Sequence, residues 1–167
     1  QLILSYQTFP SFFLQLSFAD STPSPNPIHP EVSLNRGMWV LQGWGIGNIA
    51  TGIPIAITSN DPQTAAFFQM NAGWNVVNVG LASASLIRKK PVDTKKIKRV
   101  FFVNAGLDVG YVIGGILLSR NGSINNDPQQ LGFGNSIILQ GTFLFVFDAF
   151  MGWKIWILWF CSNCCRC

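Results

Sequence analysis

The stretch from Val100 to Ser119 reads VFFVNAGLDVGYVIGGILLS. It is 20 residues long and holds a single charged side chain, Asp108. A helix needs roughly 20 mostly apolar residues to cross the ~30 Å hydrocarbon core of a bilayer. A strand of a membrane β-barrel would instead alternate polar and apolar residues over about 10 positions, and this stretch does not alternate. It therefore predicts a membrane-spanning helix.

Three further stretches have the same length and apolar character, at residues 37–58, 65–87 and about 136–160. The segments between the four stretches are short: a tight turn at 59–64, a basic segment at 88–99 and a polar segment at 120–134. Short connections place consecutive helices side by side and antiparallel. We expect an all-α fold, a membrane-embedded antiparallel four-helix bundle over residues 37–160.

The composition of the 167 residues points the same way. Charged residues make up 11% of the chain and hydrophobic residues 49%, against about 25% charged residues in soluble domains. Seven of the 11 Lys and Arg lie between Arg88 and Arg99, so no basic groove suited to nucleic acid recurs elsewhere. We expect an integral membrane protein of the plasma (inner) membrane, surrounded by lipid, with no nucleic-acid partner.

Both ends of the chain lie outside the expected bundle. Residues 1–19 are apolar and end in Ser17-Phe18-Ala19, so they are either a signal-peptide remnant or an extra membrane-associated helix. Residues 20–36 form a Pro-rich linker, and residues 161–167 a Cys-rich tail. Four cysteines within seven residues do not readily close a tetrahedron in one chain, so we expect no metal site there.

The basic segment at 88–99 bears on orientation. The positive-inside rule places it in the cytoplasm, together with the C-terminus and the start of the 37–58 helix. A cleaved signal peptide would instead leave residues 20–36 outside. Seven cations in a segment of 12 residues are the stronger signal, so we favour the charge rule.

Polar side chains recur within every apolar stretch, and we expect them to form one intramembrane polar seam. The seam residues are Asn48, Asn71, Asn75, Asn78, Asn104, Asp108, Tyr111, Gln140 and Asp148. The spacing i, i+4, i+7 on the second and third helices gives each a single polar stripe. Polar groups are costly in hydrocarbon, so we expect these two stripes to face each other across the bundle.

The seam has two interpretations. Hydrogen-bonded amides can simply hold helices in register. Alternatively, Asp108 and Asp148 form an ion or proton path, because an intramembrane carboxyl group is commonly functional. No Lys or Arg lies within two turns of Asp108 along its helix. We therefore expect Asp108 to be protonated at neutral pH.

Glycines also recur at every fourth position on two of the helices. Such stripes let membrane helices approach closely, so we expect these glycines to be packing positions. They are Gly43, Gly47, Gly106, Gly110 and Gly114.

No cofactor or enzymatic centre is visible in the sequence. The only histidine is His29, before the bundle, so the chain alone cannot provide a bis-histidine haem site. No phosphate-binding loop or nucleophile motif is present. We expect a protein that is not an enzyme and carries no cofactor.

Three motifs resemble an uncharacterised family of small bacterial four-helix integral membrane proteins, which carry a domain of unknown function. They are Met70-Asn71-x-x-Trp74-Asn75-x-x-Asn78, Asn104-Ala105-Gly106-Leu107-Asp108-Val109-Gly110-Tyr111, and Gln140-Gly141 through Phe147-Asp148. The resemblance covers roughly residues 35–150. It implies a signal-like N-terminus, which favours the opposite orientation, followed by four membrane helices. It brings no known activity.

These observations predict a structural or assembly role, as a subunit of a larger membrane complex or a homo-oligomer. The alternative is a small transporter or proton-conducting protein that uses Asp108 and Asp148.

Overall fold

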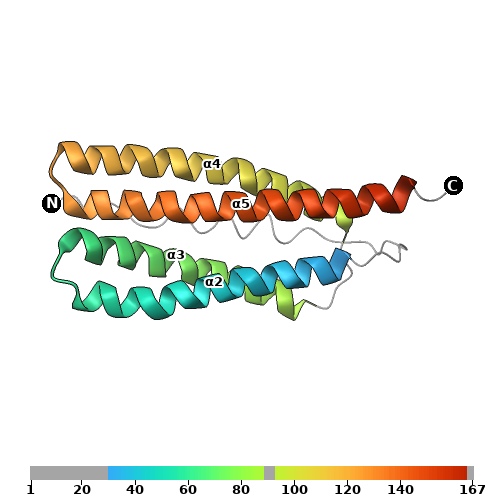
Figure 1. Cartoon of the computed structure of the whole chain (residues 1–167), viewed down its shortest axis with the longest axis horizontal. Coiled ribbons are helices and arrows are strands. Elements are labelled where there is room, and N and C mark those ends of the chain that lie inside the picture. Colours follow the sequence, from blue (N-terminus) through green and yellow to red (C-terminus); the bar gives the residue numbers. More distant parts are fainter. Residues whose placement is uncertain (1–29, 89–92, 165–167) are drawn as a thin grey trace.

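The computed structural model of the protein describes residues 30–88 and 93–164. This part of the chain is entirely helical, with no strand. The four helices are α2 (Pro30–Thr58), α3 (Pro62–Ile87), α4 (Thr94–Ile124) and α5 (Pro128–Cys164) (Figure 1). The predicted all-α fold with four helices is confirmed. The apolar segment 1–19 lies outside the described residues, as do the side chains of Cys164, Cys165 and Cys167.

The helices extend beyond the apolar stretches that predict them. α2 begins at Pro30, so residues 30–36 of the expected linker are helical, and α4 and α5 begin about six and eight residues earlier than expected. Hydropathy marks only the apolar part of a helix, whereas the hydrogen-bonded backbone continues to a capping residue. Asp93 caps α4 by accepting from the backbone N–H groups of Lys95 and Lys96, at 2.9 and 3.3 Å.

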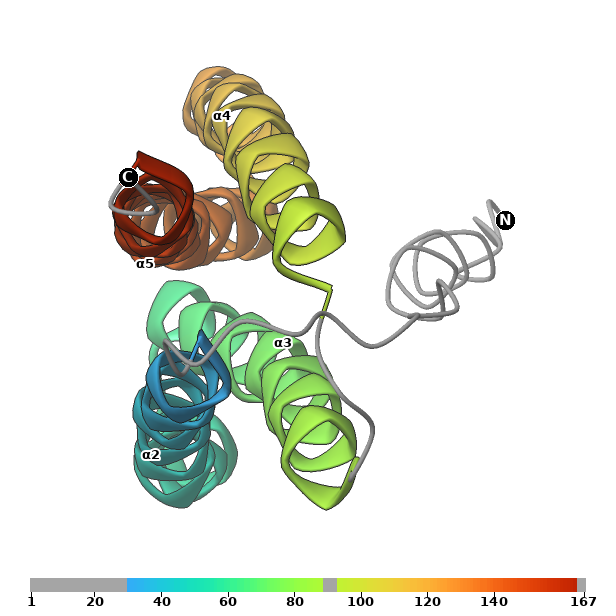
Figure 2. The same cartoon turned by 90° about the vertical axis from the view of Figure 1, so that its right-hand side faces the viewer.

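The helices form two antiparallel hairpins, α2 with α3 and α4 with α5 (Figures 1 and 2). The two hairpins meet mainly through α3 and α5. This differs from the expected face-to-face packing of α3 and α4, which have few close backbone contacts although they are consecutive. A connection places two helices near each other at one end only, and side-chain fit decides which helices pack along their lengths.

The helices approach each other closely at glycines other than the five that the sequence predicts. A Cβ atom added at Gly132 would collide with the backbone of α3, and one added at Gly134 with the backbone of α4. A Cβ atom at any of the five predicted glycines would meet nothing within 4 Å; these are Gly43, Gly47, Gly106, Gly110 and Gly114. These five therefore open onto no neighbour among the described residues, and their role in packing stays a prediction, because four-residue spacing does not reveal which face of a helix has a neighbour.

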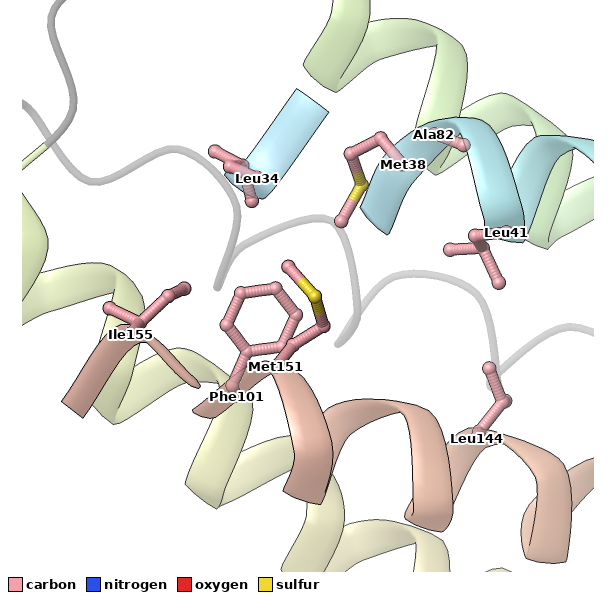
Figure 3. Close-up of a cluster of buried hydrophobic side chains, with 8 residues drawn as sticks. All are labelled: Leu34, Met38, Leu41, Ala82, Phe101, Leu144, Met151 and Ile155. Carbon is pink, nitrogen blue, oxygen red and sulfur yellow. The ribbon is translucent and has the colours of Figure 1, made fainter. Parts of the chain in front are cut away.

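A hydrophobic cluster fills the end of the bundle where α2 begins and α5 ends. Figure 3 shows its side chains converging from α2, α3, α4 and α5. Its members are Leu34, Met38, Leu41, Ala82, Phe101, Leu144, Met151 and Ile155. The cluster packs the first hairpin against the second at this end. The buried polar residues lie in the middle of the bundle.

Three of the four helices are long and apolar enough to cross a membrane: Glu31–Thr58, Thr94–Ile124 and Pro128–Cys161. The fourth, α3, is 26 residues long, and no stretch of it is apolar enough to be counted with these three. Its hydropathy is lowered by Asn71, Asn75 and Asn78, all of which are buried inside the bundle.

Candidate functional site

The interior of the bundle is unusually polar. Seven polar or ionisable side chains are buried: Asn71, Asn75, Asn78, Asp108, Ser136, Gln140 and Asp148. Large apolar side chains cover the outside, and Trp39, Ile57 and Leu117 are each more than 60% exposed. Soluble proteins show the opposite distribution. The buried polar side chains are therefore the candidate site, and they form two groups.

The first group is a chain of hydrogen-bonded amides that links α2, α3 and α5; we call it the amide chain. Asn71 lies at its centre, donating from Nδ2 to Asn48 Oδ1 at 2.7 Å and accepting at Oδ1 from Gln140 Nε2. Gln140 Oε1 in turn accepts from Trp44 Nε1 at 3.1 Å. One asparagine thus ties together three helices through side-chain contacts.

The amide chain continues along α3. Asn75 Nδ2 donates to the backbone carbonyl of Asn71 at 2.8 Å, and Asn78 Nδ2 donates to Asn75 Oδ1 at 3.4 Å. On α2, Asn48 Nδ2 donates to the backbone carbonyl of Trp44 at 2.8 Å. Each buried side-chain amide of the amide chain has a hydrogen-bond partner, as buried polar groups require. Such an arrangement holds helices in register, and neutral amides carry no proton.

An aromatic stack positions the Trp44 end of the amide chain. The rings of Trp44 and Phe143 are almost parallel, with an interplanar angle of 8° and centroids 3.9 Å apart. Phe143 lies three residues after Gln140 on α5, so the stack and the hydrogen bond join the same two helices. Trp44 therefore contributes both apolar packing and a polar donor at one position.

The second group is a pair of carboxyl groups, Asp108 on α4 and Asp148 on α5; we call it the carboxyl pair. The two side chains interact electrostatically with each other, and Asp148 also interacts with Asn104. Two ionised carboxylates repel each other, so an interacting pair of carboxyl groups in the interior favours a proton on one of them. Neither oxygen of Asp108 has a hydrogen-bond partner among the described residues, and Asp108 has no exposed surface.

Tyr111 lies beside the carboxyl pair. Its side chain interacts electrostatically with Asp108, and its ring meets the ring of Trp74 edge-on, with centroids 5.1 Å apart. This aromatic contact is one of the few between α3 and α4. Asp108 is thus enclosed by Tyr111 on its own helix and by Asp148 on the neighbouring helix.

The structure divides the predicted seam between these two groups. The amide chain contains Asn48, Asn71, Asn75, Asn78 and Gln140. The carboxyl pair contains Asp108 and Asp148, with Asn104 and Tyr111 beside it. The polar stripe of α3 faces α2 and α5, and that of α4 faces α5, so the two stripes do not form one surface.

Sequence reasoning missed two interior residues. Trp44 precedes Asn48 by one turn and so lies on the same face of α2. Ser136 precedes Gln140 by one turn on α5, is fully buried, and has a hydroxyl group without a partner. The four-residue spacing to a predicted amide was the available signal for both.

Residues 40–149 match a family of unknown function, DUF6992. The matched region contains both groups and ends one residue after Asp148. No curated protein and no solved structure matches the chain. The predicted resemblance to an uncharacterised family is confirmed at that level: the chain belongs to the family of unknown function DUF6992.

Proposed function

We propose that the protein is an integral membrane protein of the plasma (inner) membrane, with a structural or assembly role and no catalytic one. The observation that carries this proposal is the reversed distribution of side chains. The buried positions include three asparagines of α3, whereas the outward positions include Ile57, Ile87 and Leu117, which are 78%, 78% and 62% exposed. In lipid this distribution is favourable, because polar groups must be satisfied inside the protein.

We also propose that α3 is a fourth span. At 1.5 Å per residue its 26 residues reach roughly 39 Å, more than the ~30 Å hydrocarbon core. Its asparagines face the amide chain, while Val76 and Val77 are 58% and 43% exposed. Lipid would therefore contact mainly apolar atoms of α3, since its asparagines lie inside the bundle.

The assembly role rests on a face of α2 that has no neighbour among the described residues. Trp39, Ile46 and Ile53 are 65%, 52% and 46% exposed, and they share this face with Gly43 and Gly47. Small residues between large apolar ones allow a second helix to approach closely in a membrane. We propose that a second copy of the chain packs on this face, which makes the protein a homo-oligomer.

Membrane fractionation followed by light scattering in mild detergent tests this proposal. The chain should stay in the membrane pellet after alkaline carbonate washing and should elute as a dimer or larger oligomer. Gly43→Leu/Gly47→Leu should shift it to a monomer. The control is Gly73→Leu/Gly80→Leu, which places the same side chains at open positions of α3. Release by carbonate contradicts membrane integration, and a monomeric wild type contradicts the assembly role.

A second function, proton conduction, is favoured by the carboxyl pair. A carboxyl group without exposed surface that interacts with a second carboxyl group favours a transferable proton in the interior. Purified protein in liposomes with a trapped pH dye should then conduct protons. Asp108→Asn should abolish the flux in a folded protein, and Ser83→Ala on the α2–α3 contact should not. Flux that survives in both Asp108→Asn and Asp148→Asn excludes this function.

A further inference from the structure

A groove lies where α4 begins and α5 ends. These two helix ends are at the right-hand side of Figure 1. Its volume is about 560 Å³ and it is open on one side. It is lined by Lys95, Lys98, Arg99, Phe102, Val103 and Trp159. The groove belongs to neither the amide chain nor the carboxyl pair, and it combines three cations with three large apolar side chains.

Among the described residues, no ion pair neutralises the positive charge in the groove. Lys98 Nζ lies 4.6 Å and Lys95 Nζ 6.0 Å from the centroid of the Trp159 ring, and neither of them nor Arg99 pairs with a carboxylate in the described part of the chain. The nearest acid along the helix, Asp93, accepts from backbone N–H groups at the start of α4. Contact with an aromatic ring leaves a cation's charge in place, so the groove attracts an anion.

An exposed apolar face of α4 continues from the groove; we call it the trough. Phe102 and Val103 are 48% and 43% exposed, and Ile113 further along the helix is 53% exposed. Between them, Gly106 and Gly110 lie on the same face of the helix and meet nothing within 4 Å. The distance from residue 102 to residue 113 is roughly 16 Å along the helix axis, about half of the ~30 Å hydrocarbon core. The trough thus has the length of one acyl chain.

From these features we infer that the groove and trough bind an anionic glycerophospholipid. The phosphate group lies against Lys95, Lys98 and Arg99, and one acyl chain lies over Gly106 and Gly110. A free phosphate ion would gain nothing from the apolar trough. Clusters of Lys and Arg at the cytoplasmic ends of membrane helices attract acidic headgroups, and the positive-inside rule places this end of the bundle in the cytoplasmic leaflet. This inference rests on the proposed membrane location.

Native mass spectrometry of the full chain in detergent tests the charge requirement. The protein is titrated with dioleoyl phosphatidylglycerol, dioleoyl phosphatidylcholine or glycerol 3-phosphate, and the bound molecules are counted. Phosphatidylglycerol should bind most tightly, and Lys98→Gln/Arg99→Gln should weaken its binding by roughly 10- to 30-fold. The control, Arg36→Gln/Arg120→Gln, removes the same charge outside the groove and should leave the affinity within about twofold of the wild-type value, since distant exposed charges are screened.

A second variant pair separates a lipid from other occupants of the trough. Gly106→Leu/Gly110→Leu should weaken phosphatidylglycerol binding, because the new side chains fill the trough, and Gly73→Leu/Gly80→Leu should not. Equal binding of the two phospholipids, or glycerol 3-phosphate binding as tightly as phosphatidylglycerol, overturns the inference. So does a trough variant that turns a dimer into a monomer without changing lipid binding, since a second copy then occupies the trough.

Failure of the lipid site can be distinguished from failure of the proposed function. If carbonate releases the chain from membranes, the proposed function itself has failed. Equal binding of the two phospholipids by a carbonate-resistant protein refutes only the lipid site.

Discussion

Asn71 of α3 accepts a hydrogen bond from the side chain of Gln140 on α5, 69 positions later in the sequence. The same asparagine donates to Asn48 on α2. A single amide therefore joins the first hairpin to the second and α3 to its own hairpin partner. Since α3 and α5 carry most of the contact between the hairpins, this amide lies at the main junction of the bundle.

We predict that Asn71→Leu destabilises the folded protein by about 1–3 kcal/mol, because it leaves the buried amides of Gln140 and Asn48 without their partner. Asn71→Leu/Gln140→Leu should cost less than the sum of the two single changes, since it removes both members of one hydrogen bond. Unfolding in mixed micelles, followed by circular dichroism, measures both free energies. An Asn71→Leu variant as stable as the wild type would show that the amide chain does not hold the helices together.

Gly132→Ala should destabilise the protein by about 1–3 kcal/mol. The added methyl group would collide with the carbonyl oxygen of Gln63 and lie 2.9 Å from both Ala66 Cβ and Phe67 N, and backbone atoms of α3 cannot move aside cheaply. Gly73→Ala is the matched control, because a Cβ atom there meets nothing within 4 Å and alanine favours a helix by up to ~1 kcal/mol. The same unfolding assay compares them, and equal stability of the two variants would argue against close packing of α3 and α5.

Acid should destabilise the α2–α3 turn through Asp61, the N-cap of α3. The pKa of Asp61 is lowered from its ordinary 3.8, first by the hydrogen bond from the Thr64 hydroxyl and then by the backbone N–H of Thr64. A carboxyl group whose pKa is lower in the folded state stabilises that state above its unfolded pKa, and the contribution is lost as the pH falls through the folded pKa.

Wild type should therefore lose more stability than Asp61→Asn as the pH falls from about 5 to values below 3.8. Thermal unfolding of both proteins across that pH range gives the comparison. The contributions of the other acidic groups to stability are the same in both proteins and cancel in the difference. Parallel curves for the two proteins would mean that the Asp61 cap is not formed.

The carboxyl pair predicts a protonated carboxyl group at neutral pH, because Asp108 and Asp148 interact in the interior and two like charges there repel each other. Infrared spectroscopy should show a carbonyl band of a protonated acid that shifts in D₂O. Asp108→Asn should remove this band while the helical amide bands persist, because the new amide can donate to an ionised Asp148. A band unchanged in both Asp108→Asn and Asp148→Asn would place the proton elsewhere.

Sequence alone identified the helices and the inward faces of two of them, because both follow from local spacing. An apolar run of about 20 residues specifies a helix, and the spacing of Asn71, Asn75 and Asn78 specifies one face. Sequence did not identify the neighbours of these faces. Gly110 and Gly132 are both helical glycines among apolar residues, yet one is open and the other contacts α3. That difference arises from tertiary packing, which local spacing does not encode.

Hydropathy also did not predict where the helices begin and end. The apolar stretch starting at Val100 is only part of α4, since the capped helix begins at Thr94 and carries Lys95, Lys96, Lys98 and Arg99 in its first turns. Extending a predicted membrane helix back to a capping Asp would have found this start. It would also have placed the cations on a helix surface beside α5, where the groove lies.

The central claim, that the apolar outer surface faces lipid, is tested most directly by spin labels at Val109 and Val146. These residues lie near the middles of α4 and α5 and are 43% and 60% exposed. With the four natural cysteines replaced by serine and the protein in liposomes, both labels should relax with dissolved oxygen and be protected from a water-soluble nickel chelate. A label at Asn126, in the α4–α5 turn, should show the reverse. Ready access of the nickel chelate to Val109 and Val146 would contradict the account, because those faces would then lie in water.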